Sequence, residues 1–383
     1  MPGRLKFWVN DQLIRFPPAA DLVYYLAYYG NWIHSRLRDR AAEIFPVKAA
    51  ELAAVRGFPD NSGVNVGTTN ICNAKCAFCA YPRAVANGTL LTGVMTMATF
   101  QNIISGRAGL GGKVLDFTPV VGEPLIDPGL VEKIRFARAS GIATISFTTN
   151  GILLDHHDVY KKLVDEKVSA IYISIGATEA KQYQRVYGVD QYPRVISGLR
   201  HLLEYNRQSG EPVYINIRFR NAQRPSTILA SKDFVEHIKP FLSARVEVNF
   251  TVDFDNWGGA IRQEELPGTM RLRKSRPEIK IPCAALYGFS IRHDGSVRLC
   301  GCRMKFSDLD DLVVGNVNQQ SLEDISRSAQ TQKIIAGFYR GERPATCRCC
   351  LLYTPITRSW LKARLAAIDS GRPKTTSPEK VSQ

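Results

Sequence analysis

Three cysteines in the first quarter of the chain have a spacing suited to iron–sulfur chemistry. Cys72, Cys76 and Cys79 follow a C-x3-C-x2-C pattern in the segment NICNAKCAFCAYPR. Three thiolates on one loop can hold three irons of a [4Fe–4S] cube, which leaves the fourth iron open to an external ligand. A zinc site would need a fourth Cys or His nearby, and neither occurs in the fifty residues after Cys79. The spacing therefore favours a catalytic cluster over zinc.

A second group of cysteines lies about 200 residues further along the chain. Its members are Cys283, Cys300, Cys302, Cys347, Cys349 and Cys350. A secreted protein stabilised by disulfides is typically short, with its cysteines scattered through loop-rich sequence. Two separate groups in a chain of 383 residues instead indicate two metal or cluster sites.

The first cysteine loop resembles the signature of radical S-adenosylmethionine (SAM) enzymes, C-x3-C-x-aromatic-C, with Phe78 as the aromatic residue. The resemblance extends over about residues 64–355, because further motifs match in the family's order. VVGEPLIDP resembles the motif that touches the methionine end of SAM, and TTNG and Ser174 resemble positions that meet its ribose and carboxylate. The residues that match are Gly122, Glu123, Pro124, Thr149, Asn150 and Ser174. Val121 replaces a common glycine and Gly176 a common acidic residue.

This resemblance implies a specific chemistry. In that family the open iron binds the amino and carboxylate groups of SAM, and an electron from the reduced cluster cleaves the sulfonium. The resulting 5′-deoxyadenosyl radical abstracts hydrogen from an unactivated C–H bond. We therefore expect a [4Fe–4S] cluster on Cys72, Cys76 and Cys79, SAM as cofactor, and an external electron donor such as a flavodoxin or ferredoxin.

The second cysteine group resembles the SPASM and twitch extensions of the same family. The full SPASM pattern needs seven cysteines and two clusters, whereas this segment has six cysteines. The shorter twitch pattern holds one cluster by an isolated Cys, a hairpin Cys and a C-x2-C. It implies one auxiliary [4Fe–4S] cluster with these ligands: Cys283, Cys300, Cys347 and Cys350. Cys302 and Cys349 are then spare thiols, or either replaces a neighbour as ligand.

The fate of the substrate radical depends on nearby groups. An auxiliary cluster can accept its electron, and a base must then take the accompanying proton. Asp253 and Asp255 are the candidates for that base, in VDFDNWGG. A free thiol can instead return a hydrogen atom and give an epimer; we expect Cys302 in that role, on the same strand face as Cys300. Arg218 and Arg220 are candidates to hold an anionic substrate.

The elements around these motifs predict an α/β fold. Strand-like runs alternate with helix-like stretches at about 96–106, 129–140, 157–167, 192–208 and 226–242. The runs cover 64–69, 114–121, 143–149, 170–176, 213–219 and 245–252. Such alternation predicts a parallel sheet curled by right-handed crossovers into a partial (β/α)6 barrel. GFSIRHDGSVRLC then predicts a hairpin turning at Asp294-Gly295, and a helix opens at Ser321.

We expect four parts in the chain. Residues 1–60 form a hairpin and a helix from Asp21, 61–255 the barrel, 256–358 the SPASM/twitch-like auxiliary cluster domain, and 359–383 a tail whose end is disordered. The helix after Asp21 repeats apolar residues at helical spacing. It therefore packs on the main domain, with a membrane-surface helix as the alternative.

Composition narrows the function classes. No apolar run reaches the ~20 residues of a membrane span, and the first residues lack a secretory pattern, so we expect a cytoplasmic enzyme. The net charge of +15 suggests an anionic partner. We expect a radical SAM oxidoreductase or epimerase that oxidises or epimerises a small hydroxylated or anionic molecule. Maturation of a ribosomal peptide and RNA modification are the alternatives.

Overall fold

The structure is a computed structural model that describes residues 16–53, 55, 64–88, 90–109, 113–274, 280–301 and 310–371. Almost all of the predicted N-terminal hairpin and most of the polar C-terminal end lie outside these residues, and so does Cys302.

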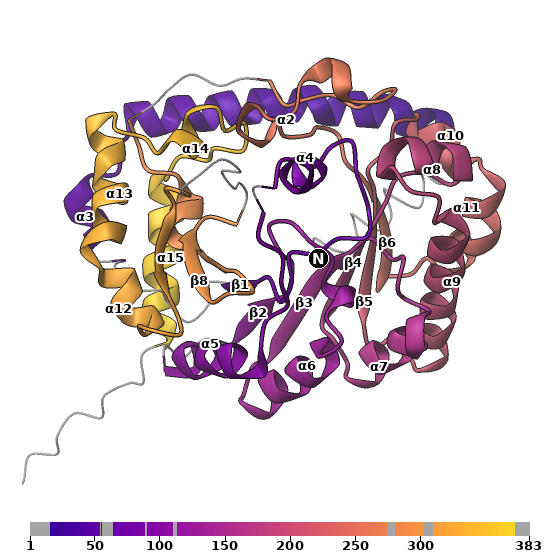
Figure 1. Cartoon of the computed structure of the whole chain (residues 1–383). Coiled ribbons are helices and arrows are strands. Elements are labelled where there is room, and N and C mark those ends of the chain that lie inside the picture. Colours follow the sequence, from indigo (N-terminus) through magenta and orange to yellow (C-terminus); the bar gives the residue numbers. More distant parts are fainter. Residues whose placement is uncertain are drawn as a thin grey trace, which may run out of the picture.

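Six parallel strands form the predicted partial barrel and pair in chain order (Figure 1). They are β1 (Val64–Val66), β2 (Val114–Asp116), β3 (Thr144–Thr149), β4 (Ala170–Ile175), β5 (Tyr214–Phe219) and β6 (Val246–Phe250). β2 ends five residues before the predicted end because the Asp116 carboxylate accepts hydrogen bonds from the Thr118 N–H and the Ser146 hydroxyl. Such a side-chain turn ends the extended run.

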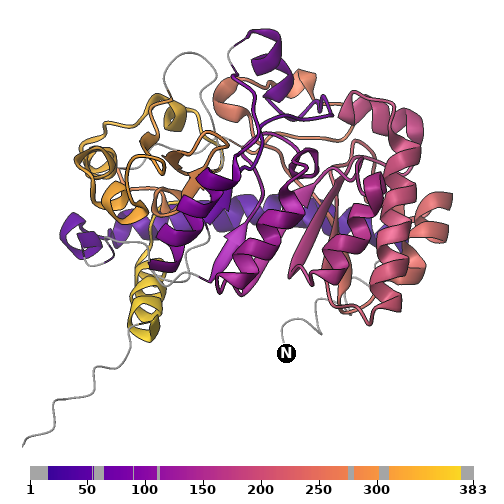
Figure 2. The same cartoon turned by 60° about the horizontal axis from the view of Figure 1, so that its bottom comes forward.

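Helices cover the outer face of these strands, which Figure 2 shows from a second direction. They are α5 (Met97–Gly109), α6 (Leu130–Ala139), α7 (Val159–Asp165), α8 (Ala180–Tyr187), α9 (Tyr192–Gln208), α10 (Pro225–Leu229) and α11 (Lys232–His237). The single helix predicted at 226–242 is wrong: Ser231 adopts an extended conformation and its hydroxyl accepts the Phe234 N–H, so a new helix starts there.

The sheet continues into the C-terminal part of the chain. The predicted hairpin is confirmed as β7 (Phe289–Ile291) and β8 (Ser296–Leu299), with Gly295 at φ +81° in the turn. β7 pairs in parallel with β1, and β9 (Val313–Asn316) pairs with β8. The barrel and the auxiliary strands therefore share one nine-stranded sheet, in the order β6-β5-β4-β3-β2-β1-β7-β8-β9.

Short helices follow these strands. They are α12 (Leu322–Arg327), α13 (Ala329–Arg340), α14 (Ala345–Arg348) and α15 (Arg358–Gly371). Ser321 opens α12 as expected, but Ser328 caps a separate helix by accepting the Thr331 N–H. On α15, Trp360 packs edge-on against Tyr287, and the Arg364 guanidinium donates to the Tyr287 carbonyl.

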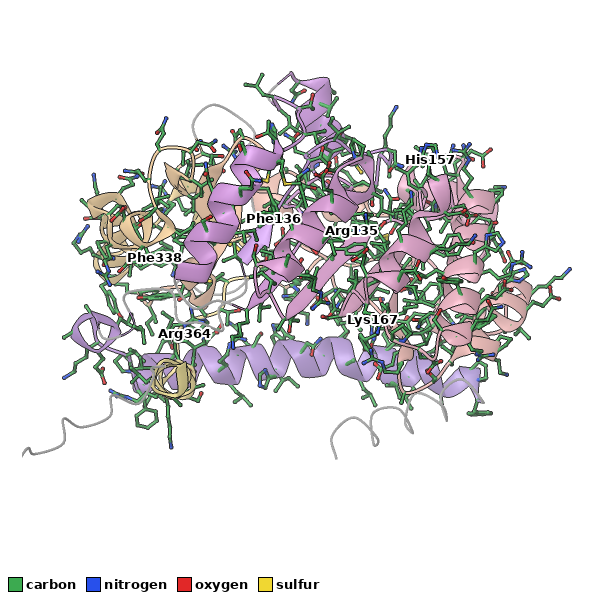
Figure 3. The ribbon with its side chains drawn as sticks, turned by 90° about the horizontal axis from the view of Figure 1, so that it is seen from below. Arg135, Phe136, His157, Lys167, Phe338 and Arg364 are labelled. Atoms are coloured by element: carbon green, nitrogen blue, oxygen red, sulfur yellow. The ribbon has the colours of Figure 1, made fainter. Side chains whose placement is uncertain are left out.

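A long N-terminal helix spans both halves of the molecule. α2 (Pro17–Ile44), followed by α3 (Ala49–Ala53), crosses from the α10 side to the α13 side in Figure 1. Figure 3 shows its full length from below, with Arg364 of α15 near one end. The expected packing on the main domain is confirmed, because the Tyr24 and Tyr28 hydroxyls donate to the carbonyls of Thr251 and Leu272.

The start of α2 differs from the prediction. The helix begins at Pro17 because proline fits the first turn of a helix. Asp21 instead accepts hydrogen bonds from the backbone N–H and hydroxyl of Ser226 on α10. Leu22, Leu26 and Leu37 are each more than 60% exposed on the outer face of α2. Among the residues described, no helix is long and apolar enough to span a membrane.

Candidate functional site

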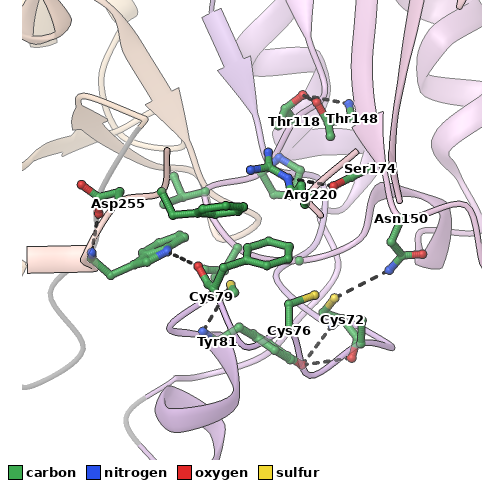
Figure 4. Close-up of a pocket in the computed structure, with 18 of the residues that line it drawn as sticks. Cys72, Cys76, Cys79, Tyr81, Thr118, Thr148, Asn150, Ser174, Arg220 and Asp255 are labelled. Carbon is green, nitrogen blue, oxygen red and sulfur yellow. Dashed lines mark hydrogen bonds between the residues drawn. The ribbon is translucent and has the colours of Figure 1, made fainter. Parts of the chain in front are cut away.

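A cavity of about 490 Å³ lies at the carboxyl ends of the barrel strands. This is the end at which barrel enzymes carry their chemistry. Figure 4 shows the three cysteines of the first group on one loop at this cavity, with Ser174 and Arg220 reaching in from neighbouring strand ends. Most of the predicted residues line it: Cys72, Cys76, Phe78, Cys79, Gly122, Glu123, Thr149, Asn150, Ser174, Arg218, Arg220, Asp253 and Asp255.

The C-terminal end of α8 holds the cysteine loop in place. The Lys75 and Ala77 N–H groups donate to the carbonyls of Tyr187 and Val186 at 2.8 and 2.9 Å. Gly188 ends α8 at φ +67°, and a Cβ there would lie 2.5 Å from the Lys75 carbonyl oxygen. α8 was not predicted from the sequence, although the spacing of Tyr183, Val186 and Tyr187 before a glycine is a helix-end signal.

The thiols of the first group are half-buried and lie beside hydrogen-bond donors. The Tyr81 N–H donates to Cys79 Sγ at 3.5 Å, and Asn150 Nδ2 lies 4.0 Å from Cys72 Sγ. Burial raises the pKa of the Cys72 thiol to about 12 and that of Cys76 well above its usual value. A positively charged partner, such as the irons of a cluster, would favour the thiolate form of both cysteines.

The donor set fits a cubane cluster with one open iron. Three cysteines face the cavity, and its described lining contains no fourth. Within the described ranges, no group of three or more His, Cys, Asp or Glu side chains is arranged to hold a metal ion. A cubane places each thiolate on a separate iron, so this arrangement is compatible with it.

Glu123 ties two of the predicted motifs together. Its buried carboxylate accepts hydrogen bonds from the Thr149 hydroxyl at 2.6 Å, the Asn150 N–H at 2.7 Å and the Leu125 N–H at 3.1 Å. Burial raises its pKa to about 7. Gly122 lies at φ +125°, where a Cβ would come within 2.6 Å of the Thr69 carbonyl oxygen, so no side chain fits there.

The two departures from the family motifs have packing reasons. Val121 is buried against Tyr81, next to Cys72 and Cys79. Gly176 leaves room for the Tyr187 ring, because a Cβ there would lie 2.7 Å from it. An acidic side chain therefore has no space at position 176.

Two arginines from the end of β5 pack on aromatic rings beside the cysteine loop. Arg220 Nε donates to Ser174 Oγ at 2.8 Å, and its guanidinium lies 5.2 Å from the centre of the Phe78 ring. The Arg218 guanidinium lies 3.9 Å from the centre of the Tyr172 ring. The Ser174 hydroxyl also shares a hydrogen bond with the Tyr187 hydroxyl. Side chains that are able to bind an anion thus reach the cavity from the ends of β4 and β5.

Each of the two candidate bases has a fixed partner: a guanidinium for Asp253 and a backbone N–H for Asp255. Asp253 Oδ1 accepts a hydrogen bond from Arg273 Nε at 2.7 Å, and Asp255 accepts one from the Trp257 N–H. The Trp257 indole in turn donates to the Phe78 carbonyl, in the cysteine loop, at 2.9 Å. The sequence did not point to Arg273, whose role depends on a fold that brings it to Asp253.

Four cysteines of the second group surround a separate small cavity. Its lining contains all four predicted ligands: Cys283, Cys300, Cys347 and Cys350. Cys349 is exposed. Burial raises the pKa of Cys283 to about 12, and a cationic partner would favour the thiolate form of this residue too. The donor set fits a cluster with four thiolate ligands.

The backbone at Cys300 corrects one prediction. β8 ends at Leu299, and Cys300 adopts a left-handed conformation at φ +77°. The fully buried Arg298 fixes this turn, because its guanidinium pairs with Asp310 at 2.9 Å and donates to the Cys300 carbonyl. The strand therefore ends before Cys300, contrary to the prediction that Cys300 lies on it, and Cys302 itself lies outside the described residues.

The two cysteine sites lie close to each other. Gly301, which follows Cys300, and Leu352, two residues after Cys350, both line the central cavity. The Trp257–Gly259 turn that holds Phe78 also packs against α14, which carries Cys347.

Comparisons with known proteins agree with this arrangement. The family model of the radical SAM superfamily matches residues 66–217, and that of the iron-sulfur cluster-binding domain called SPASM matches residues 283–351. A probable GTP 3′,8-cyclase of Metallosphaera sedula is 24% identical over 300 residues, which cover 72% of this chain and 90% of that protein. A GTP 3′,8-cyclase of Chlorobaculum tepidum is 30% identical over 141 residues, which cover 37% of this chain and 40% of that protein.

Solved structures show the same fold at low identity. Native anSMEcpe with bound AdoMet has a TM-score of 0.51 at 15% identity and covers 81% of this chain and 96% of that chain. Streptococcus suis SuiB bound to precursor peptide SuiA also has a TM-score of 0.51 at 15% identity, over 80% of this chain and 73% of that chain. The two family matches imply a [4Fe–4S] cluster with SAM and an auxiliary iron–sulfur cluster. The chain therefore belongs to the radical SAM superfamily and carries a C-terminal iron–sulfur cluster-binding domain.

Proposed function

We propose that this radical SAM enzyme oxidises a small anionic substrate bound in the central cavity, with the auxiliary cluster as electron acceptor. The observation that carries this proposal is the position of Gly301 and Leu352 in the lining of the cavity. Both residues lie within two positions of proposed ligands of the auxiliary cluster, so a substrate in the cavity lies near that cluster.

The chain supplies two sets of thiolates in this proposal. Cys72, Cys76 and Cys79 hold the catalytic cluster, and the second set holds the auxiliary cluster: Cys283, Cys300, Cys347 and Cys350. When bound, the first cluster and SAM supply a radical able to break an unactivated C–H bond, and the second cluster supplies a one-electron acceptor.

The remaining cavity residues bind and orient the substrate. Arg218 and Arg220 present guanidinium groups from the end of β5, which suit a carboxylate or phosphate. Asp253 or Asp255 takes the proton that leaves when the substrate radical loses its electron. Glu123, Thr149 and Asn150 position the loops around SAM through the hydrogen bonds described above. In the epimerisation alternative, Cys302 is the hydrogen donor.

The relatives favour a second candidate function, cyclisation of a purine nucleotide. The Metallosphaera sedula relative, named as a probable GTP 3′,8-cyclase, aligns over 72% of this chain. An intramolecular cyclisation without net oxidation leaves the mass of the substrate unchanged, whereas the proposed oxidation removes two hydrogens. Product mass therefore separates the two functions. Peptide maturation is supported only by similarity of fold to SuiB.

The test uses the anaerobically reconstituted full chain, which should hold about eight irons in two cubes. GTP and a panel of phosphorylated sugars and nucleotides are incubated with SAM and a reductant, and 5′-deoxyadenosine and product mass are measured. Replacing Cys72, Cys76 and Cys79 together by Ala should leave about four irons and abolish SAM cleavage. Cys283→Ala should remove the second cluster and abolish product, while SAM cleavage without substrate persists.

Cys349→Ala is the matched control, because Cys349 is exposed and absent from the lining of the auxiliary cavity. It should keep both clusters and full turnover. Full turnover by a Cys283→Ala enzyme shown to lack the second cluster would contradict the electron-acceptor role. A product of unchanged mass from GTP would favour cyclisation instead.

A further inference from the structure

A second cleft of about 230 Å³ lies beside the central cavity. Asp253 and Arg273 line both spaces, so their ion pair forms the wall between them. The other lining residues of the cleft are Tyr28, Asn31, Trp32, His34, Ser35, Arg38, Lys274, Leu351 and Thr354.

The cleft is built almost entirely from parts of the chain outside the family matches. One wall is the middle of α2, and another is the segment that contains Asp253, Arg273 and Lys274. The two family models match residues 66–217 and 283–351, so only Leu351 at the end of the second match contributes. The cleft therefore lies almost entirely outside the residues that match the two family models.

Hydrogen bonds fix the two walls against each other. The Tyr24 and Tyr28 hydroxyls of α2 donate to the carbonyls of Thr251 and Leu272, next to the residues of the ion pair. The Phe254 N–H donates to the Arg271 carbonyl, and the Arg273 N–H donates to the Phe254 carbonyl. The cleft and the ion pair are therefore preformed.

The charge of the cleft suits an anion. Arg38, Arg273 and Lys274 line it together with one carboxylate, Asp253. Arg38 also pairs with Asp39 at 3.9 Å, outside the lining, so Lys274 and Arg273 are the main cations that face the cleft. Lys274 Nζ lies 4.3 Å from the centre of the Trp32 ring and 4.9 Å from that of Tyr29, so two aromatic rings position this ammonium. In the described part of the chain, Lys274 has no carboxylate within salt-bridge distance.

The ion pair leaves donors available at the wall. Arg273 contacts Asp253 through Nε, and the rest of a guanidinium fork can donate to phosphate oxygens. Asp253 meanwhile faces the central cavity as well. A ligand that spans the wall would thus meet cations at one end and the reacting site at the other.

We propose that this cleft binds the phosphorylated end of the substrate, while the carbon that reacts lies in the central cavity. The inference rests on the proposed function and adds the substrate class, a phosphate ester or polyphosphate. It also gives α2 a role in specificity, because α2 forms the wall opposite Lys274.

The test measures binding of inorganic tripolyphosphate to the anaerobically reconstituted full chain by calorimetry. Lys274→Ala removes an exposed side chain, so the fold is retained, and binding should weaken about tenfold or more, as expected for loss of a charged hydrogen bond. Lys232→Ala is the matched control: Lys232 is an exposed lysine of α11, outside both cavities. Binding to this variant should equal that to wild type.

Equal binding by wild type and Lys274→Ala would overturn the inference, and so would an absence of binding by wild type at millimolar tripolyphosphate. SAM cleavage without substrate is measured on the same samples. If wild type fails to cleave SAM, the proposed function fails. If it cleaves SAM but the tripolyphosphate results fail as above, only the inference is lost.

Discussion

At the scale of single residues, Glu123 shows how a family motif is used in this chain. Its carboxylate lies inside the wall of the cavity and accepts three hydrogen bonds, two of them from the TTNG motif. Burial outweighs these bonds and raises its pKa to about 7. The residue therefore connects two motifs, and its titration affects the stability of the fold.

This shift predicts a pH dependence. Because the pKa of Glu123 is about 7 when folded and near 4.5 when unfolded, the folded state binds the proton more tightly. The protonated Glu123 carboxyl therefore stabilises the fold fully below about pH 4.5. This contribution to the free energy of unfolding, at most about 3 kcal/mol, is lost as the pH rises to about 7. Glu123→Gln should lose less stability than wild type between pH 5 and 8, measured by anaerobic denaturant unfolding. Equal losses would show that this carboxyl does not titrate as described.

At the scale of elements, α8 and the cysteine loop form one unit. Two carbonyls at the end of α8 accept N–H groups from the loop, and Gly188 allows the close approach. The three thiols can reach one cluster only if the loop backbone is held in one conformation. α8 supplies that constraint.

Gly188→Ala should therefore disturb the first cluster. The new Cβ would lie 2.5 Å from the Lys75 carbonyl oxygen, so the loop must move. Gly210→Ala is the matched control, since Gly210 has a similar φ of +80° but nothing lies within 4 Å of its Cβ position. Both variants have backbone strain of about 1–2 kcal/mol, but only Gly188→Ala should lose iron and SAM cleavage. Iron content and 5′-deoxyadenosine release test this, and equal iron in both variants would contradict it.

At the scale of the whole molecule, one sheet joins the barrel to the auxiliary part. β7 pairs with β1 over Val64–Val66, and the side chains of Phe289 and Ile291 are buried. The N-terminal segment connects both halves from the other side. Tyr24 of α2 donates to the segment after β6, and the Tyr339 hydroxyl of α13 donates to the carbonyl of Val47, which follows α2. The two cluster sites are therefore held at a fixed separation.

A chain that ends at Pro282 should not fold into a stable barrel. Removing β7 exposes β1 as an unpaired edge strand and uncovers buried apolar side chains, which favours aggregation. A chain that ends at Gly371 keeps every described element and is the control. Soluble yield and size-exclusion chromatography compare the two. A soluble, monomeric chain ending at Pro282 that still binds the first cluster would refute the expectation.

The sequence by itself determined the parts of this protein that depend on local patterns. The six barrel strands, the hairpin at Gly295 and the two cysteine groups follow from alternation, turn residues and spacing, which act within about ten residues. For the same reason the motif order predicted which strand ends form the cavity. The roles of individual residues as ligands or bases stay predictions.

Only the tertiary structure decided the contacts between distant segments. The pair of Asp253 with Arg273, the bond from the Trp257 indole to Phe78, and the pairing of β1 with β7 join residues 20 to about 225 positions apart. Asp21 looked like a helix cap but bonds to Ser226, because the fold brings α10 against the start of α2. Such contacts depend on which surfaces meet when the sheet curls and α2 packs across it. No local pattern encodes that meeting, so the cleft beside the cavity is visible only in three dimensions.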